Sequence, residues 1–312
     1  MRIMVTGATG FIGKPLCVRL LQEGHEVLAL SRDAARAESA LGKEVTCLKW
    51  GDESDREWAQ AIGTVDTVVH LAGESVGGER WNAEYKRKIF DSRILTTRAL
   101  VEAIGSQATK PTALVCASAV GYYGDRRDEI LTEASAPGTD FLARTCREWE
   151  AEAGKAEALG LRVARMRIGI VLGRGGALEQ MLYPLPHLPI SPFKLGLGGP
   201  LGSGRQWVPW IHVEDVVGMF TWAAATETVR GVYNVTAPNP VMNAEFVHAI
   251  GHILHRPAVA PMPGFLLKAA LGEFADVLLG GQRALPTAAL QLGYRFRYET
   301  LEEALRALLS AM

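Results

Sequence analysis

The chain has 312 residues and a formal net charge of −1 at pH 7, a length that can bury a large core and divide into two lobes. The near-zero charge argues against a nucleic acid or a membrane surface as the main partner, and no uninterrupted apolar run is long enough to cross a bilayer. The chain opens directly on a core strand with no room for a cleaved signal, and its cysteines lack metal-ligand spacing, so we expect a cytoplasmic protein without a metal site.

The first thirteen residues, MRIMVTGATGFIG, join a short apolar strand at 3–5 to three spaced glycines and a helix expected at 11–23. Gly7 permits a sharp turn, Gly10 lets bare backbone approach a pyrophosphate, and Gly13 lets the helix pack closely on the strand. N–H groups at the helix start attract phosphate oxygens, so the segment predicts a dinucleotide-binding loop; a tight turn without a ligand is the alternative. The expected contacts are Gly7, Thr9, Gly10, Phe11, Ile12 and Gly13.

Strand and helix patterns alternate through the first half of the chain, which is the arrangement that a doubly wound parallel sheet requires. Right-handed crossovers bring the carboxyl ends of the strands to one edge, where ligands bind in such sheets. We therefore expect an α/β fold with a Rossmann-type sheet. Beyond the first strand and helix, the expected strands are 25–30, 44–48, 66–71, 112–116 and 161–168, and the expected helices are 82–105 and 138–159.

The character of the chain changes after residue 172. Residues 173–204 are rich in glycine and proline and predict irregular loops rather than a helix or strand. We expect residues 1–172 to form an NADP-binding Rossmann domain, to which a strand near 231–235 returns. Residues 173–312 are expected to form mostly a smaller C-terminal lobe, with a small-molecule substrate in the cleft between the lobes. The later helices are expected at 213–226, 243–254 and 301–309.

The end of the second strand distinguishes the two nicotinamide cofactors. An acidic residue there would bind the ribose 2′-hydroxyl of NAD, whereas a basic residue favours the 2′-phosphate of NADP. This chain has Ser31 followed by Arg32, whose guanidinium suits phosphate oxygens, so we predict NADP(H) as the cofactor. An ordinary surface arginine is the alternative. Trp50, after the third strand, either flanks the adenine or belongs to the core.

Five stretches carry longer motifs: LAGES at 71–75, RWNAEYKRKIFDSR at 80–93, RIGIVLGRGGAL at 167–178, LGLGGPLGSGRQWVPWIHVEDV at 195–216 and NVTAPNP at 234–240. Together they resemble the atypical, extended short-chain dehydrogenase/reductases, the epimerase-like group of the NAD-dependent epimerase/dehydratase superfamily. The resemblance implies an NADP(H)-binding Rossmann domain and a small C-terminal lobe, and it leaves the substrate undefined.

The same resemblance extends to the loop after the strand at 66–71. It implies that Leu71, Ala72 and Gly73 run along the ribose on the nicotinamide side of the cofactor. It also implies cofactor contacts for Glu74 and Arg80, with a surface ion pair between these two as the alternative.

In that superfamily a serine or threonine polarises the substrate, and a tyrosine in a YxxxK motif transfers a proton while the lysine lowers its pKa. Ser118, just past the strand at 112–116, stands where the superfamily serine is expected, with a turn serine as the alternative. Aligning Glu150 with the acidic residue that follows the motif puts Leu142 at the tyrosine position and Cys146 at the lysine position. Neither side chain supplies the usual chemistry, so the standard epimerase mechanism does not carry over.

Three routes could replace the missing proton donor. Tyr122 or Tyr123 could act as the acid beside Ser118, although without a nearby cation each is expected to be a packing or stacking residue. Cys146 could donate a proton if Arg93 lowers its pKa, with a buried inert cysteine as the alternative. Water or the substrate could also supply the proton. Arg93 replaces the asparagine that usually supports the lysine, and we expect it beside the cofactor.

Two functions remain open. The leading one is an NADP(H)-dependent oxidoreductase that acts on an unidentified small molecule as a monomer or homodimer. The alternative is a non-catalytic protein that senses NADP(H) and reports to a partner, because the proton relay is missing and some relatives of the group are linked to cell division. Trp207, Trp210 and His212 are expected at the rim between the lobes, where they either clamp a planar substrate or lock the lobes together.

Overall fold

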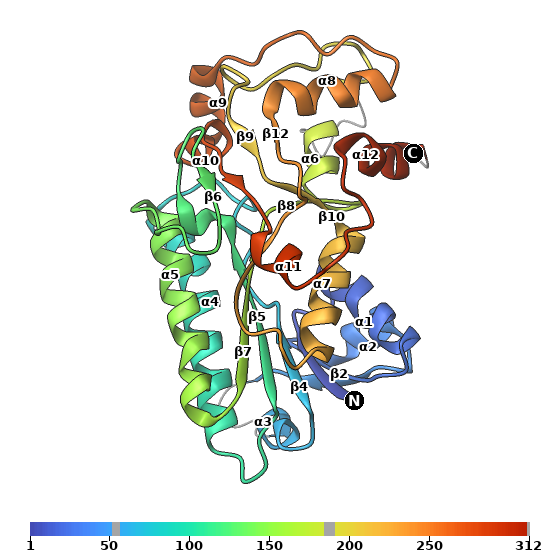
Figure 1. Ribbon diagram of the computed structural model, residues 1–312, viewed down its shortest axis with the longest axis vertical. Coiled ribbons are helices and arrows are strands. Elements are labelled where there is room, and N and C mark those ends of the chain that lie inside the picture. Colours follow the sequence, from blue (N-terminus) through green and yellow to red (C-terminus); the bar gives the residue numbers. More distant parts are fainter. Residues whose placement is uncertain (52–56, 184–190, 311–312) are drawn as a thin grey trace.

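The structure, a computed structural model, describes residues 1–51, 57–183 and 191–310. The main strands are β1 (Arg2–Thr6), β2 (Glu26–Ser31), β3 (Thr46–Lys49), β4 (Thr67–His70), β5 (Ala113–Ala119), β7 (Arg162–Ile168) and β11 (Gly231–Val235). Within the described ranges these seven form one parallel sheet in the order β11-β7-β5-β4-β1-β2-β3 (Figure 1). The strand order reverses between β1 and β4, and at such a point the carboxyl edge of the sheet opens a ligand-binding crevice.

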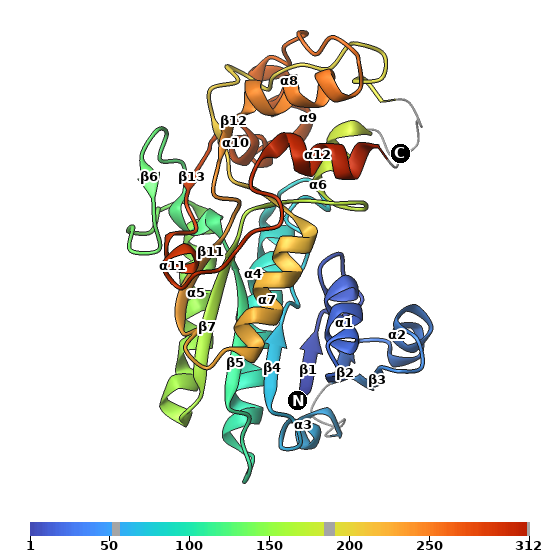
Figure 2. The same cartoon turned by 45° about the vertical axis from the view of Figure 1, so that its right-hand side comes forward.

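Helices cover both faces of the sheet. α4 (Ala83–Gly105) and α5 (Phe141–Gly154) lie side by side along one face, and α1 (Gly13–Gln22) and α7 (Val213–Ala225) pack together on the other (Figures 1 and 2). Because both faces are covered, the central strands are apolar, and residues 3–6 of β1 are fully buried. The α/β fold with a Rossmann-type doubly wound parallel sheet is therefore confirmed.

The helix ends are set by local capping. Asp140 accepts the N–H of Ala143 at 2.8 Å and starts α5, which therefore begins later than the predicted residue 138. The sequence patterns did not predict two short helices: α2 (Ala34–Leu41), between β2 and β3, and α3 (Glu57–Ile62), between β3 and β4. No helix in the described ranges combines the length and the apolar character that crossing a membrane requires.

Helices of the later part of the chain, including α8 (Asn243–Ile253) and α12 (Leu301–Leu309), form the upper part of the molecule in Figures 1 and 2. There α8 and α12 pack around a second apolar core that includes Phe246 and Leu305. β11, by contrast, pairs in parallel with β7 in the main sheet. The other short elements of the chain are η1 (Val120–Tyr123), β6 (Ile130–Leu131), η2 (Lys155–Leu159), β8 (Ile170–Leu172), β9 (Trp207–Val208), β10 (Trp210–His212), β12 (Val241–Met242), α9 (Gly264–Leu271), α10 (Phe274–Leu279), β13 (Arg283–Ala284) and α11 (Thr287–Gln291).

One prediction for this part of the chain is wrong. The stretch 173–204 is predicted to be irregular, but it contains helix α6 (Ala177–Leu182). The helix forms because ALEQML consists of good helix formers and buries Leu178 and Leu182 in the second core. Residues 184–190 of the same stretch lie outside the described residues.

Gly13→Ala is expected to destabilise the protein, because a Cβ at this position would lie 2.2 Å from the carbonyl oxygen of Gly7. Helix α1 would have to move away from the loop, and we expect a loss of about 2 kcal/mol in the free energy of unfolding, measured by urea denaturation. Gly105→Ala is the matched control, because its Cβ would meet Leu159 only at an ordinary 3.6 Å within α4. That variant should be neutral or slightly stabilising, and equal losses for the two variants would contradict the steric explanation.

Candidate functional site

The glycine-rich loop after β1 meets the loop after β4 through bare backbone. Gly7 has a φ of +67°, and a Cβ there would lie 2.8 Å from the carbonyl carbon of Leu71 and 2.9 Å from the backbone nitrogen of Ala72. The N–H of Gly10 donates to the carbonyl oxygen of Gly7 at 3.0 Å, which closes the turn. Bare backbone therefore lines the carboxyl edge between β1 and β4, in a space that a side chain at Gly7 would fill. A pyrophosphate requires such close access to the backbone.

A hydrogen-bonded joint fixes the ends of β1 and β4 beside this loop. Thr6 Oγ1 accepts the N–H groups of Leu71 and Ala72, both at 3.2 Å, and lies 2.7 Å from Nδ1 of His70. His70 Nε2 lies 3.0 Å from Thr97 Oγ1 on α4. Burial lowers the pKa of His70 to about 3, so the ring is neutral at ordinary pH. The motif-based interpretation missed this histidine, although it directly precedes the LAGES stretch.

At the predicted adenosine end, Arg32 lies exposed just after β2. Within the described part of the chain it makes no ion pair or hydrogen bond through its guanidinium, so this cation is open to a ligand. Ser31 ends β2, and its carbonyl oxygen accepts the N–H of Trp50 at 2.8 Å. The Trp50 ring centroid lies 5.7 Å from that of Trp58 and 5.9 Å from that of His70, which favours the core alternative for Trp50. A contact with adenine stays a prediction.

Arg93 holds the loop after β4 in place. Its Nη2 donates to the carbonyl oxygen of Glu74 at 2.9 Å, and its guanidinium lies 5.2 Å from the centroid of the Trp149 ring. The ion pair between Glu74 and Arg80 that the sequence left open is not formed among the described residues, and Arg80 is exposed. Cofactor contacts for Glu74, Arg80 and Arg93 stay predictions.

Ser118 lies inside β5 rather than past the end of the strand, which corrects the predicted boundary. Residues 117–119 remain strand because they continue to pair with β7, and Ser118 lies opposite Arg167. The Ser118 hydroxyl donates to Oε1 of Glu150 at 2.7 Å. Glu150 also accepts from Nε and Nη2 of Arg167, at 2.7 and 2.8 Å, and all three residues are buried. Ser118 therefore belongs to a buried, paired charge cluster.

Glu150 and Arg167 are functional candidates that the motif-based interpretation missed. Glu150 entered only as an alignment landmark, and Arg167 only as the first letter of a matching stretch. Two signals could have indicated them: Glu150 follows Cys146 by one helical turn on α5, and the parallel register of the sheet puts Arg167 beside Ser118.

The expectation that Tyr122 and Tyr123 lack a nearby cation is wrong. The Arg167 guanidinium carbon lies 3.4 Å from the centroid of the Tyr122 ring and 5.1 Å from that of Tyr123. Tyr123 is fully buried, accepts from Arg167 Nη1 at 2.9 Å and donates to Oδ1 of Asn234 at 2.7 Å. Tyr122 is half-buried, and its hydroxyl has no hydrogen bond within the described ranges. Of the two tyrosines, Tyr122 has the hydroxyl that is not already engaged.

Leu142 and Cys146 do not take over the proton transfer of the tyrosine and lysine in the YxxxK motif. Leu142 packs beside Gly121, where a Cβ would lie 3.4 Å from the leucine Cβ. Burial, together with the nearby charge of Glu150, raises the pKa of the Cys146 thiol to about 12. The nearby Arg93 lowers the pKa of this thiol, but too little to offset burial, so the condition for Cys146 as a proton donor is not met. The thiol is buried and protonated, as in the inert alternative.

The rim residues are largely satisfied by the protein itself. Trp207 Nε1 donates to Oδ1 of Asp128 at 2.9 Å, and the Arg283 guanidinium lies 4.4 Å from a centroid of its ring. Trp210 is fully buried and donates to the carbonyl oxygen of Asn239. Because both indole N–H groups already have partners within the protein, these contacts favour the alternative in which the tryptophans join the two lobes rather than clamp a planar substrate.

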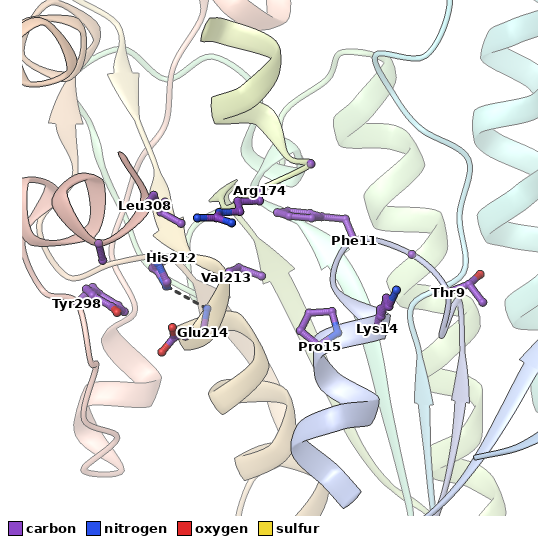
Figure 3. A pocket seen from close by; sticks show the side chains of 13 residues that line it. Thr9, Phe11, Lys14, Pro15, Arg174, His212, Val213, Glu214, Tyr298 and Leu308 are labelled. Carbon is purple, nitrogen blue, oxygen red and sulfur yellow. Dashed lines mark hydrogen bonds between the residues drawn. The ribbon is translucent and has the colours of Figure 1, made fainter. Parts of the chain in front are cut away.

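A crevice of about 630 Å³ opens between the glycine-rich loop, the start of α7 and helix α12 (Figure 3). It is lined by Thr9, Gly10, Phe11, Lys14, Pro15, Arg174, Gly175, His212, Val213, Glu214, Tyr298, Ala307 and Leu308. Apart from the glycine-rich loop, none of the predicted cofactor or catalytic residues lines it. Over residues 1–51, 57–183 and 191–310, no three His, Cys, Asp or Glu side chains gather to hold a metal ion.

Two family models match the chain. Residues 3–236 match the NAD dependent epimerase/dehydratase family, and residues 262–308 match a domain of unknown function, DUF1731. The first match contains the glycine-rich loop, Ser118, Tyr122 and the Arg167–Glu150 pair. The second contains α12 and most of the C-terminal helices.

Similar proteins cover almost the whole chain. The Arabidopsis thaliana epimerase family protein SDR39U1 homolog, chloroplastic, is 42% identical over 99% of this chain and 87% of its own length. The Bacillus subtilis epimerase family protein YfhF is 42% identical over 99% of this chain and 98% of its own. A crystal structure of the human epimerase family protein SDR39U1 with NADPH superposes with a TM-score of 0.87, at 36% identity and 100% coverage of both chains.

The neutral His70 predicts a pH dependence of stability. The unfolded histidine binds a proton below a pKa of about 6.5, whereas folded His70 stays neutral down to about 3, so its contribution is present above the unfolded pKa and is lost as pH falls. Between about pH 7.5 and about pH 5, the wild type should lose about 2 kcal/mol more unfolding free energy than His70→Gln. Urea denaturation at both pH values measures this. As the control, replacing the exposed His248 by Gln should leave the wild-type loss of unfolding free energy unchanged. If His70→Gln loses as much unfolding free energy as the wild type between the two pH values, the low pKa of folded His70 is wrong.

Proposed function

This chain belongs to the NAD dependent epimerase/dehydratase family, and we propose that it is an NADP(H)-binding, epimerase-like oxidoreductase that acts on a small molecule. The observation that carries the proposal is Tyr122, whose unengaged hydroxyl stands on a ring packed against the buried Arg167–Glu150 pair. Tyr122 follows the carboxyl end of β5, and the glycine-rich loop follows the carboxyl end of β1. In a parallel sheet these two ends lie at one edge, where a coenzyme and its substrate meet.

The coenzyme assignment is supported by the residues at that edge. Gly7 and Gly10 leave backbone bare where a pyrophosphate would lie, and Arg32 presents an unengaged cation for a 2′-phosphate. The human relative that was crystallised with NADPH supports the same choice. The backbone of 71–73 would run along the nicotinamide-side ribose. The other proposed contacts are Thr9, Phe11, Ile12, Gly13, Ser31, Glu74, Arg80 and Arg93.

A proton donor at Tyr122 completes a reduction. When bound, NADPH would supply the hydride for an electron-poor carbon of a carbonyl or activated alkene. Tyr122 gives its hydroxyl proton to the substrate atom that gains the negative charge, and it is reprotonated from water. Arg167 stabilises the transient phenolate across the ring face, while Glu150 holds Arg167 in position. Ser118 donates its own proton to Glu150, so its oxygen is left as an acceptor for a hydrogen of the substrate.

The substrate is proposed to bind between the Rossmann domain at 1–172, with its returning strand near 231–235, and the smaller lobe built mostly from 173–312. Three half-buried aromatic rings meet where the two parts would join: Trp81, just before α4, Phe141 at the start of α5 and Phe274 at the start of α10. The Trp81 ring centroid lies 5.4 Å from that of Phe141 and 5.7 Å from that of Phe274. A cytoplasmic location and a monomeric or homodimeric state remain predictions.

A second candidate function is non-catalytic sensing of NADP(H), with a partner that could be linked to cell division. The specific observation that favours it is the state of the usual tyrosine and lysine positions. Leucine stands at one, and a buried thiol of raised pKa stands at the other. Coenzyme binding without turnover would then be the signal.

Arg32→Ala should weaken NADPH binding roughly 10- to 100-fold, because it removes charge-assisted hydrogen bonds to the 2′-phosphate, and should leave NADH binding nearly unchanged. Fluorescence titration of both coenzymes measures the two affinities. Arg147→Ala, which removes an exposed arginine from α5, is the matched control and should change neither. Equal losses for NADPH and NADH in Arg32→Ala would argue against the assignment of the 2′-phosphate to Arg32.

Tyr122→Phe should lower single-turnover oxidation of NADPH with a responsive metabolite pool by roughly 10²- to 10⁴-fold, because it removes the proton donor and leaves the ring in place. NADPH affinity should not change. Tyr183→Phe, at the end of α6, is the matched control and should retain the wild-type rate. An unaltered rate in Tyr122→Phe would remove Tyr122 from the mechanism. No turnover with any pool, together with a partner captured only in the presence of NADPH, would favour the sensor.

A further inference from the structure

We propose that the crevice between the starts of α1 and α7 and helix α12 is a second ligand site, which binds a small organic anion beside the coenzyme edge. The suggested ligand carries one carboxylate or phosphate group on a compact apolar body. This site lies beyond the proposed oxidoreductase function, and neither proposal requires the other.

The walls of the crevice combine an apolar surface with a cationic rim. Phe11, Pro15, Val213 and Leu308 supply apolar side chains around the volume (Figure 3). Such a surface accommodates a compact hydrocarbon or ring rather than a bare inorganic ion. The apolar body of the ligand is inferred from these residues.

The charges around the opening favour an anion. Lys14, from the first turn of α1, and Arg174, from the loop before α6, both line the crevice and are exposed. The one acidic side chain in the lining, Glu214, is paired with Arg297 at 2.5 Å, which offsets its charge. The partial positive charges at the starts of α1 and α7 add to this field. Two basic side chains and one acidic side chain, itself paired, therefore line the crevice.

His212 supplies an unpaired hydrogen-bond donor in the same wall. Its Nδ1 accepts the N–H of Glu214 at 3.1 Å and caps α7, so in the neutral ring the proton is on Nε2. The side chain is 2% exposed, and Nε2 has no partner among the described residues. The Tyr298 ring covers His212 with a centroid separation of 3.9 Å. A buried donor without an acceptor is unfavourable, and a ligand oxygen admitted by a small movement of Tyr298 would satisfy it.

The crevice is joined to the coenzyme loop through Phe11. A Cβ at Gly173 would lie 2.8 Å from the Phe11 ring, and a Cβ at Gly176 would lie 2.4 Å from it. The loop that carries Arg174 therefore packs directly on the glycine-rich loop. The residues predicted to contact the rest of the coenzyme, Ser31, Arg32 and 71–74, are absent from the lining. The two sites share Thr9, Gly10 and Phe11 of the glycine-rich loop, whereas Arg174 and His212 belong to the crevice alone.

The test is calorimetric titration of the full chain with phenyl phosphate, benzoate and inorganic phosphate, each with and without saturating NADPH. We expect phenyl phosphate or benzoate to bind at least about tenfold more tightly than inorganic phosphate, because only they fill the apolar wall. Arg174→Gln should weaken the tighter ligand by about tenfold or more and leave NADPH affinity unchanged. Arg19→Gln removes a cation from α1 away from the crevice and is the matched control, which should bind like the wild type.

Two further measurements separate the crevice from the coenzyme site and from a folding defect. Arg32→Ala should weaken NADPH and leave the organic anion unaffected. His212→Asn keeps a side chain that can cap α7 and should weaken the anion at an unchanged melting temperature. The proposal is overturned if NADPH displaces the anion competitively, if Arg19→Gln weakens binding as much as Arg174→Gln, or if none of the three anions binds.

Discussion

The buried ion pair between Arg167 and Glu150 is the interaction on which the rest of the candidate site depends. Taking two charges out of water is costly, and the pair is tolerated only where its remaining polar atoms are also satisfied. Ser118 and Tyr123 do this, with hydrogen bonds of 2.7 Å to Glu150 and 2.9 Å from Arg167. Because these residues come from β5, β7, α5 and η1, one charge pair joins four elements. The pair also places the Arg167 guanidinium against the Tyr122 ring. The resemblance to the superfamily did not predict a cation at this position, because Cys146 stands where the lysine is expected.

Neutral groups join the ends of β1 and β4 at the coenzyme edge. Thr6, His70 and Thr97 form a neutral chain of hydrogen bonds that ties β1, β4 and α4 together. The absence of a Cβ at Gly7 then lets two backbone segments touch at the reversal of strand order. At this junction the attraction of phosphate is left to backbone N–H groups and to Arg32. Different interactions therefore stabilise the two parts of the site. A buried ion pair holds the elements around Tyr122 together, and neutral hydrogen bonds hold the ends of β1 and β4 together.

The Phe11 ring connects the coenzyme loop to the C-terminal part of the molecule. The glycines at 173 and 176 allow a second loop to lie directly on this ring, and that loop carries Arg174 into the crevice beside His212. A ligand in the crevice would brace the glycine-rich loop from outside. Coenzyme affinity and occupancy of the crevice could then influence each other through one packed side chain.

The sequence by itself determined the elements whose signals are local. Alternating apolar strands and helices, together with Gly7, Gly10 and Gly13, were enough for the doubly wound sheet, because periodicity and backbone freedom are encoded within a few neighbouring residues. The position of Arg32 after β2 was likewise readable from order alone. Tertiary structure decided the rest. The extension of β5 past Ser118, the cation under Tyr122 and the raised pKa of Cys146 depend on β7 and α5 meeting across the sheet, and burial and long-range register leave no trace in local spacing.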